Sequence, residues 1–191
     1  MRLFIAIDLP GATRDRIEAL ISELRREVPD VRWAGIDGIH LTLKFLGEVG
    51  ENRLPALAQI LGRRAAALSG GFTVGVRGVG TFGGTSRPRV AWCGVVDPEG
   101  ALARLAADVE EGCAGLGFPR EGRPFHPHLT LARIKVASRG LAPALAARAD
   151  LDLGGFEVTS YHLFQSRLQS GGAKYLRLAE CRLGGPVAAP S

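Results

Sequence analysis

The tetrapeptide His-Leu-Thr-Leu occurs twice in this 191-residue chain, at His40–Leu43 and again at His128–Leu131. The surroundings of the two copies also repeat. An apolar run that ends in an aspartate lies 32 positions before the first histidine and 31 positions before the second. A chance match of four residues would not carry its neighbours with it. We therefore expect residues 1–183 to form one domain of two similar halves, about 1–88 and 89–183.

Each half shows the same alternation of strands and helices. Short apolar runs bounded by turn residues predict strands, and apolar residues spaced three or four apart predict helices. The expected strands lie near residues 3–7, 40–46, 72–79, 90–96, 128–131, 156–164 and 174–182, and the expected helices near 17–28, 53–68, 102–115 and 141–148. This order predicts an α+β fold with two lobes, an approximate twofold axis and a sheet in each lobe. Whether the lobes exchange strands is left open, and residues 184–191 are predicted to be a disordered tail.

Composition narrows the class of protein. A hydrophobic share of 46% is enough to close a core, and a net charge of +5 suits an anionic partner without identifying one. No stretch approaches the roughly 18 uninterrupted apolar residues of a membrane span, and the first apolar run is too short for a signal peptide. The cysteines, Cys93, Cys113 and Cys181, are odd in number and widely spaced, which argues against a disulfide framework or a structural zinc site. We expect a cytoplasmic protein.

The repeated motif has a direct chemical meaning on a strand. Alternate side chains share a face, so His40 lies beside Thr42, and His128 beside Thr130, while the leucines serve the core. An imidazole exchanges protons near neutral pH, and a hydroxyl can donate to a phosphate oxygen as negative charge accumulates. Two imidazoles and two hydroxyls suit a phosphodiester. No metal is expected, because the set lacks the carboxylate or third imidazole of most catalytic zinc sites.

Other interpretations of the histidines remain open at this point. A single His-x-Thr pair on a strand is commonly structural, with the ring bonded to the neighbouring hydroxyl. The second copy at an equivalent position argues against that interpretation here. His126 and His128 could bind a metal, but they are two ligands without a third. His162 lies in an alternating strand and is interpreted as a packing or surface residue.

Several segments together resemble a known group of enzymes. They are Arg2–Pro10, Trp33, His40–Gly47 and Pro127–Arg133, and the similarity continues to Gly172–Tyr175. The pattern resembles the two-histidine phosphoesterase superfamily, and within it the bacterial and archaeal RNA 2',3'-cyclic phosphodiesterases, also called the 2'-5' RNA ligase (LigT-like) family. The resemblance implies antiparallel-rich sheets with a catalytic cleft between the lobes. It also implies metal-independent hydrolysis of an RNA or nucleoside 2',3'-cyclic phosphate to the 2'-phosphomonoester, with reversible 2'-5' RNA ligation as a further reaction.

The resemblance also implies roles for single residues. His40 would be the general acid that protonates the leaving 3'-oxygen, and His128 the general base that activates water. Thr42 and Thr130 would hold the phosphate, and Arg133 would add positive charge. Strict alternation would put Arg133 on the leucine face unless the strand bends just before it. The symmetric motif itself does not reveal which histidine is the acid.

Substrate recognition is less visible in the sequence. Trp33, Phe45 and Phe125 flank the motifs and are candidates for stacking on a base, with the core as the alternative place for each. Five basic residues are candidates for an RNA-binding rim, with ordinary solvated loops as the alternative: Lys44, Arg87, Arg89, Arg120 and Arg123.

The expected partner is RNA, or a nucleotide, with a 2',3'-cyclic phosphate end, and the expected state is a monomer without a cofactor. Two other functions are kept as alternatives. The first is a related phosphoesterase that acts on 2'-5' oligonucleotides. The second is a nucleotide- or RNA-binding module without turnover, although a binder has no evident need of two proton carriers.

Overall fold

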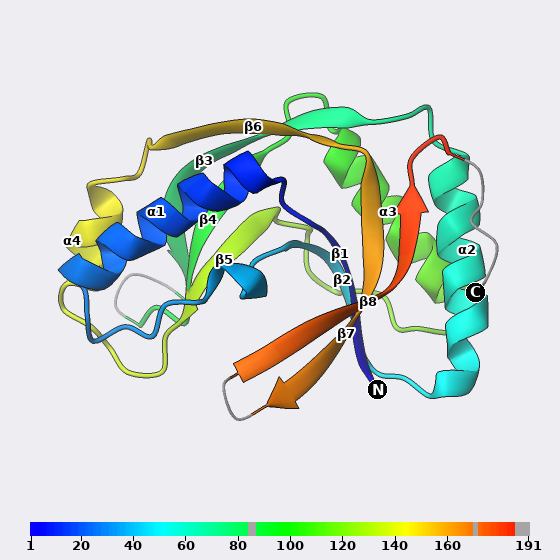
Figure 1. Ribbon diagram of the computed structural model, residues 1–191, viewed down its shortest axis with the longest axis horizontal. Helices are drawn as coiled ribbons and strands as arrows, with labels where there is room; N and C mark the ends of the chain where they lie inside the picture. The colour runs from blue at the N-terminus through cyan, green and yellow to red at the C-terminus, as the bar shows by residue number, and fades with distance from the viewer. Residues whose placement is uncertain (84–86, 170–171, 186–191) are drawn as a thin grey trace.

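The structure is a computed structural model that describes residues 1–83, 87–169 and 172–185 (Figure 1). It contains eight strands and four α-helices in these residues, in an order close to the predicted one. The strands are β1 (Arg2–Ile7), β2 (Leu41–Glu48), β3 (Phe72–Phe82), β4 (Val90–Val96), β5 (His128–Arg133), β6 (Asp152–Val158), β7 (Ser160–Gln169) and β8 (Gly172–Arg182); the helices are α1 (Gly11–Glu27), α2 (Leu54–Ala66), α3 (Ala101–Gly115) and α4 (Leu141–Ala146).

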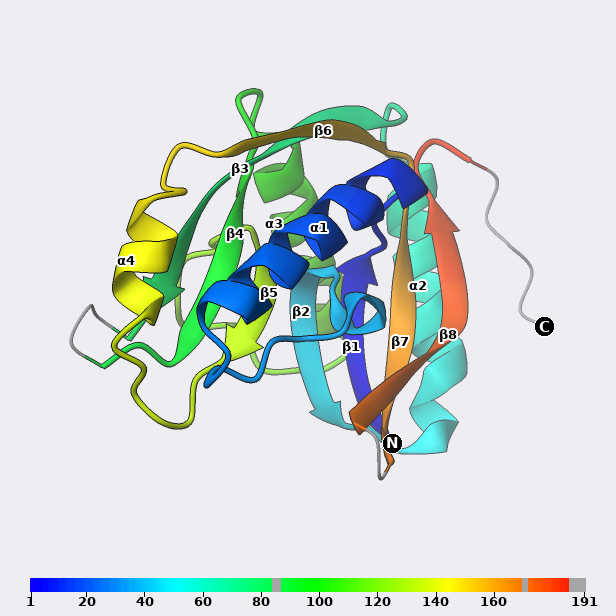
Figure 2. The ribbon, with the colours of Figure 1, turned by 60° about the vertical axis from the view of Figure 1, so that its left-hand side comes forward.

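All eight strands belong to one curled sheet in the order β6-β3-β4-β5-β2-β1-β7-β8, and the described pairs are antiparallel. The sheet has two groups of four strands, β6-β3-β4-β5 and β2-β1-β7-β8, and Figure 2 shows the second group side by side. The groups meet where Leu41 of β2 faces Leu129 of β5. The predicted α+β class is confirmed, but the separate sheets expected in each lobe are joined through this contact.

The two groups of strands draw on both parts of the chain. β3 lies with β4, β5 and β6, whereas β7 and β8 lie with β1 and β2. The prediction of a single strand near 156–164 was wrong, because the chain leaves β6 at one edge of the sheet and starts β7 in the other group. The change occurs at Thr159, whose carbonyl accepts the N–H of Leu183 at 2.9 Å. The division into two similar halves at residue 88 stays a prediction.

Helices cover both groups of strands. In Figure 1, α1 and α4 lie on the side of β3 and β6, and α2 and α3 lie together on the side of β8. Apolar side chains of the helices join those of the strands in one buried core, to which Ile17 of α1 and Leu57 of α2 belong. The first two residues of the predicted tail belong to a turn, in which the N–H of Gly185 donates to the carbonyl of Arg182 at 3.4 Å. The N–H of Gly184 also donates to the carbonyl of Ala65 in α2 at 2.9 Å. The rest of that prediction, residues 186–191, lies outside the described residues.

Candidate active site

The two His-x-Thr pairs lie on strands that touch each other. Leu41 pairs with Leu129, and because the two strands are antiparallel, His40 lies opposite Thr130 and Thr42 lies opposite His128. All four of these polar side chains are half-buried, whereas the four leucines of the motifs are at most 7% exposed. The alternation predicted from the sequence is therefore present, and one face of the sheet collects two imidazoles and two hydroxyls.

A β-bulge decides the position of Arg133. Trp92 pairs with Thr130 and Ala91 pairs with Ala132, so that Leu131 has no partner on β4. The extra residue shifts the alternation by one. Leu131 and Ala132 are both buried, and Arg133 is exposed again. This bulge brings the guanidinium back to the face of Thr130. Burial lowers the pKa of His128, and the positive charge of Arg133 adds to this effect.

The same bulge occurs in the first motif. Ala6 pairs with Thr42 and Ile5 pairs with Lys44, so Leu43 is the unpaired residue. Lys44 is consequently buried, at 6% exposure, whereas Phe45 is 63% exposed on the histidine face. Phe45 thus occupies in β2 the place that Arg133 has in β5. Of the three aromatic candidates, it is the one that offers a free ring.

His40 lies among aromatic rings of the neighbouring strands. Its ring centroid is 5.2 Å from that of Phe4, 5.5 Å from that of Phe164 and 4.6 Å from that of Tyr175. Burial among these rings lowers the pKa of His40 to about 4, and the negative charge of Asp8 opposes the change. Ile7 of β1 pairs with Leu41 of β2, so the next step of this antiparallel register places Asp8 opposite His40.

Asp8 is a residue of the site that the sequence did not identify. Its negative charge acts on His40, and it forms an ion pair with Arg177 of β8. In the sequence, the end of the first apolar run matched the end of the corresponding run at Asp97. The carboxylate of Asp97 instead accepts the N–H of Ala103 at 3.0 Å, in the first turn of α3. Only the pairing of β1 with β2 reveals that Asp8 lies near His40, and the sequence does not show that pairing.

His128 has a different environment. Its Nδ1 lies 2.7 Å from the carbonyl oxygen of His126, and Phe82 contacts its ring edge to face at 4.9 Å between centroids. Because a carbonyl only accepts, Nδ1 carries the proton in this contact and Nε2 keeps a lone pair. Burial lowers the pKa of His128, and the contact with His126 opposes this effect. On β4, the residue paired with His128 is Gly94.

His162 is buried on the same face but outside the two motifs. It is 7% exposed, pairs with Ala6 of β1, and lies 5.7 Å from Phe164 between ring centroids. In the other group of strands, Trp92 pairs with Gly80, where a Cβ would lie 2.5 Å from the indole ring. In the group of strands that carries the first motif, Ala6 of β1 thus lies beside His162 of β7. In the group that carries the second motif, Trp92 of β4 lies beside Gly80 of β3.

Two of the predicted stacking residues are placed differently from Phe45. Trp33 is 6% exposed in the core, and its indole N–H donates to the carbonyl of Val28 at 3.0 Å. This burial favours the core, the alternative place expected for Trp33, over stacking on a base. The neighbouring Ala34 donates its N–H to the carbonyl of Leu131 at 2.8 Å, so this segment supports the bulge of β5. Phe125 is half-buried and packs against the core.

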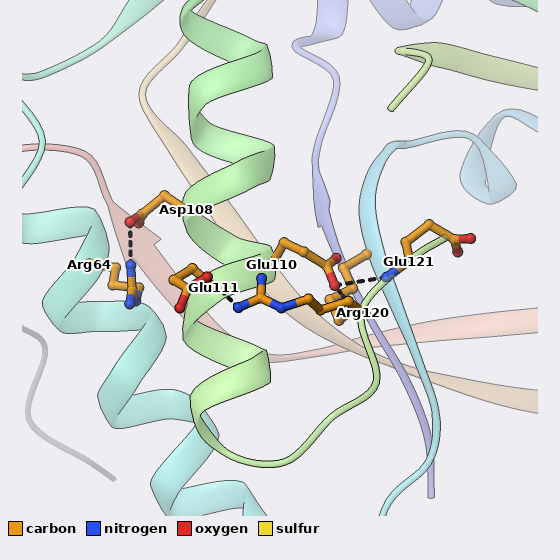
Figure 3. Close-up of polar contacts among 7 residues, drawn as sticks. Arg64, Asp108, Glu110, Glu111, Arg120 and Glu121 are labelled. Atoms are coloured by element: carbon orange, nitrogen blue, oxygen red, sulfur yellow. Dashed lines mark hydrogen bonds and ion pairs between the residues drawn. The ribbon is translucent and has the colours of Figure 1, made fainter. Parts of the chain in front are cut away.

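Two members of the predicted basic rim are ion-paired with α3, and Figure 3 shows the pair of Arg120 with Glu111. The Nζ of Lys44 lies 2.6 Å from Glu110, and it is buried, so it does not belong to a solvent-facing rim. Arg120 lies 2.6 Å from Glu111 at the surface.

The described residues offer no ready-made metal site. No three His, Cys, Asp or Glu side chains gather there as metal ligands would. None of the helices in this part of the chain is long and apolar enough to cross a membrane.

Known proteins resemble the chain over nearly its full length. The sequence pattern of the 2'-5' RNA ligase superfamily matches residues 13–169. The RNA 2',3'-cyclic phosphodiesterase of Archaeoglobus fulgidus is 37% identical over 92% of this chain and 96% of its own. TT0787 of Thermus thermophilus has a similar structure, with a TM-score of 0.78 and 31% identity over 97% and 99% of the two chains. E. coli LigT complexed with 3'-AMP has a TM-score of 0.75 and 31% identity over 95% and 97%.

Proposed function

Because the chain belongs to the 2'-5' RNA ligase superfamily, we propose that it is an enzyme that hydrolyses RNA or nucleoside 2',3'-cyclic phosphates to 2'-phosphomonoesters. The relative from Archaeoglobus fulgidus is named an RNA 2',3'-cyclic phosphodiesterase. The observation that carries the proposal is the contact of Leu41 with Leu129, which joins two His-x-Thr pairs on one face of the sheet. A binding module would need the hydroxyls but not two proton carriers.

In the proposed reaction, water attacks the cyclic phosphate and the bond from phosphorus to the 3'-oxygen breaks. His128 takes the proton of the water through Nε2, which is free because Nδ1–H donates to the carbonyl of His126. His40 gives a proton to the departing 3'-oxygen. Thr42 and Thr130 donate to the nonbridging oxygens, and Arg133 stabilises the same negative charge. These proton transfers require no metal ion.

The surroundings of the two rings support this assignment of acid and base. Burial lowers the pKa of both rings. At His40, Asp8 opposes this effect more strongly than Arg14 adds to it, whereas at His128 Arg133 adds to it. A carboxylate favours the protonated ring, and a guanidinium favours the neutral one. The phosphate of the substrate adds a further negative charge near His40 and favours its protonated form during the reaction.

The test is product analysis with the purified protein. It is incubated with each nucleoside 2',3'-cyclic phosphate and with an RNA that ends in one, and the phosphomonoester is identified by chromatography against 2'- and 3'-phosphate standards. We expect the 2'-phosphate, loss of activity in His40→Ala and in His128→Ala, and full activity after dialysis against EDTA. His162→Asn is the control, because it removes a buried imidazole from the same face. Full activity in either motif variant would refute the mechanism.

The same assay separates the other candidate reactions. A 2'-5' linked dinucleotide tests action on 2'-5' oligonucleotides, and an RNA pair with a cyclic phosphate and a 5'-hydroxyl end tests ligation. We also propose that the protein works as a monomer in the cytoplasm. All residues of the proposed site come from one chain, and the cysteines are free and buried, as suits a reducing compartment. Light scattering after size-exclusion chromatography tests the first part and cell fractionation the second.

A further inference from the structure

The charges of the chain are unevenly distributed. Residues 73–96 and 122–149 contain no Asp or Glu, although the whole chain has 19. They do contain eight of the 24 Lys and Arg residues, which are Arg77, Arg87, Arg89, Arg123, Arg133, Lys135, Arg139 and Arg148. These two segments form almost all of β3, together with β4, β5 and α4, so they make up three of the four strands of one group and the helix beside it. The net positive charge of the protein is thus concentrated around the second motif.

A polar pocket of about 420 Å³ lies within this basic region, between residues 87–89, which precede β4, and residues 134–137, which follow β5. Arg87, Arg89 and Lys135 line it, and all three are exposed. Among the residues that the structure describes, no carboxylate forms an ion pair with any of these three side chains. Arg148 of the same region, by contrast, is neutralised by Glu23 and Glu27 of α1.

The backbone of this pocket is held in place. The N–H of Arg89 donates to the carbonyl of Phe82 at 2.8 Å, and the carbonyl of Arg89 accepts the N–H of Ile134 at 2.8 Å. Gly83 has a φ of +98°, and a Cβ there would lie 2.9 Å from the carbonyl oxygen of Arg87. Only glycine fits this close approach comfortably. The segments that carry Arg89 and Lys135 are therefore fixed next to each other by the sheet.

The pocket also lies directly beyond the second motif. Arg133, which the bulge turns toward Thr130, is the last residue of β5, and the pocket begins with the next residue. At about 3.3 Å per residue, Lys135 lies no more than roughly 17 Å from Thr130 along the chain. A phosphate bound at Thr130 and one bound in the pocket would need a nucleotide chain between them, because a single nucleoside cyclic phosphate has only one phosphate.

We propose that Arg87, Arg89 and Lys135 form a second phosphate site, which binds the backbone of the RNA strand upstream of its cyclic phosphate end. The inference rests on the proposed function, because it assumes that the reacting phosphate lies at the two motifs. It makes the preferred substrate a polynucleotide end rather than a free nucleoside cyclic phosphate. Arg133 contacts the reacting phosphate, and the pocket contacts an earlier one.

The test compares a short and a long ligand. The double variant Arg89→Gln/Lys135→Gln removes two charges from the pocket, and Arg25→Gln/Arg26→Gln removes two exposed charges from the last turn of α1. We would measure kcat/KM for a single nucleoside 2',3'-cyclic phosphate and for an RNA of about ten nucleotides with a cyclic phosphate end, long enough to reach the pocket from the motifs. Binding of the same RNA with a 3'-phosphate end is measured by fluorescence anisotropy at several salt concentrations.

The pocket variant should bind the RNA roughly tenfold more weakly at low salt and lose a similar factor in kcat/KM for the RNA. Two lost phosphate contacts should also reduce the slope of log Kd against log salt by about 1.4, at about 0.7 for each contact with a single strand. Turnover of the single nucleoside cyclic phosphate should change less than about twofold, because that ligand has no phosphate to place in the pocket. The α1 control should leave both substrates unaffected.

Two results would overturn the inference. Equal losses for the short and the long substrate would mean that the variant damages the reacting site, and unchanged RNA binding would mean that the pocket does not contact the strand. The outcome is separate from that of the proposed function. If the wild type hydrolyses neither substrate, the enzymatic proposal fails, and the anisotropy data still decide whether the pocket binds RNA.

Discussion

The ion pair between Lys44 and Glu110 should contribute more to stability than any surface pair of this protein. The Nζ of Lys44 lies 2.6 Å from the carboxylate of Glu110 and 2.9 Å from the carbonyl oxygen of Pro119. The exposed fractions of the two side chains are 5% and 20%. Glu110 also accepts the N–H of Glu121 at 2.9 Å (Figure 3). The pair attaches β2, the strand that follows His40, to α3.

Replacement of Lys44 by Met tests this contribution. Removing one partner of a fully buried pair costs about 3–5 kcal/mol, because the other charge stays buried without compensation. Glu110 keeps some exposure and the N–H of Glu121, so we expect a smaller loss of about 2–4 kcal/mol in the free energy of unfolding. For a chain of this size, about 2–4 °C per kcal/mol makes this a fall in Tm of roughly 5–15 °C.

The assay is urea unfolding followed by circular dichroism, in a double-mutant cycle with Glu110→Gln. The glutamine removes the charge but keeps an acceptor for the N–H of Glu121. The double variant should therefore lose less stability than the two single variants together. Arg120→Met is the matched control, because its pair with Glu111 has the same length of 2.6 Å but exposed fractions of 58% and 57%. Its loss should stay below about 1 kcal/mol.

A loss in Lys44→Met no larger than that of the control would refute the argument from burial. Activity provides a second check, because Lys44 was a sequence-based candidate for an RNA-binding rim. If the side chain acts only in the fold, Lys44→Met keeps its KM for a cyclic-phosphate RNA at a temperature well below its Tm. A raised KM with unchanged stability would restore the sequence-based interpretation.

Three further predictions concern the site and its surroundings. Asp8→Asn should lower the pKa of His40 further, which reduces kcat/KM at neutral pH about tenfold per pKa unit and moves the pH optimum down; a superimposable pH profile would contradict this. Gly80→Ala would place a Cβ 2.5 Å from the ring of Trp92 and should cost about 1–3 kcal/mol, measured by urea unfolding, whereas Gly115→Ala, which meets open space, should not destabilise. Burial lowers the pKa of His40 to about 4 in the folded protein, so between about pH 4 and pH 6.5 the unfolded chain binds more protons than the folded protein does. The free energy of unfolding should therefore fall as the pH is lowered from about 7 to about 4. Urea titrations across this range check the sign, and a rise on acidification would contradict it.

The sequence contained the periodic features of this fold but not the local breaks in its sheet. The apolar run at Val90–Val96 predicted β4 with its observed bounds, because a buried strand between turn residues has few alternatives. The bulges at Leu43 and Leu131 could not be predicted, since a bulge is a relation between two strands. They explain why Lys44 is buried. The change of direction at Thr159 lacked a glycine or proline signal in the sequence.

The identical motifs are useful because their surroundings differ. Hydrolysis of a cyclic phosphate has a direction, with water on one side and a leaving oxygen on the other, so one ring must give a proton and the other take one. In the sheet, Asp8 stands beside His40, and Gly94 stands beside His128. A carboxylate side chain could not replace Gly94 beside His128. A Cβ on Gly94 would lie 2.7 Å from the carbonyl oxygen of Arg77, because β3 passes there. The backbone of the second lobe therefore leaves no room beside His128 for a carboxylate such as that of Asp8, which favours the protonated form of His40, the proposed acid. This difference keeps the two copies of the tetrapeptide chemically distinct.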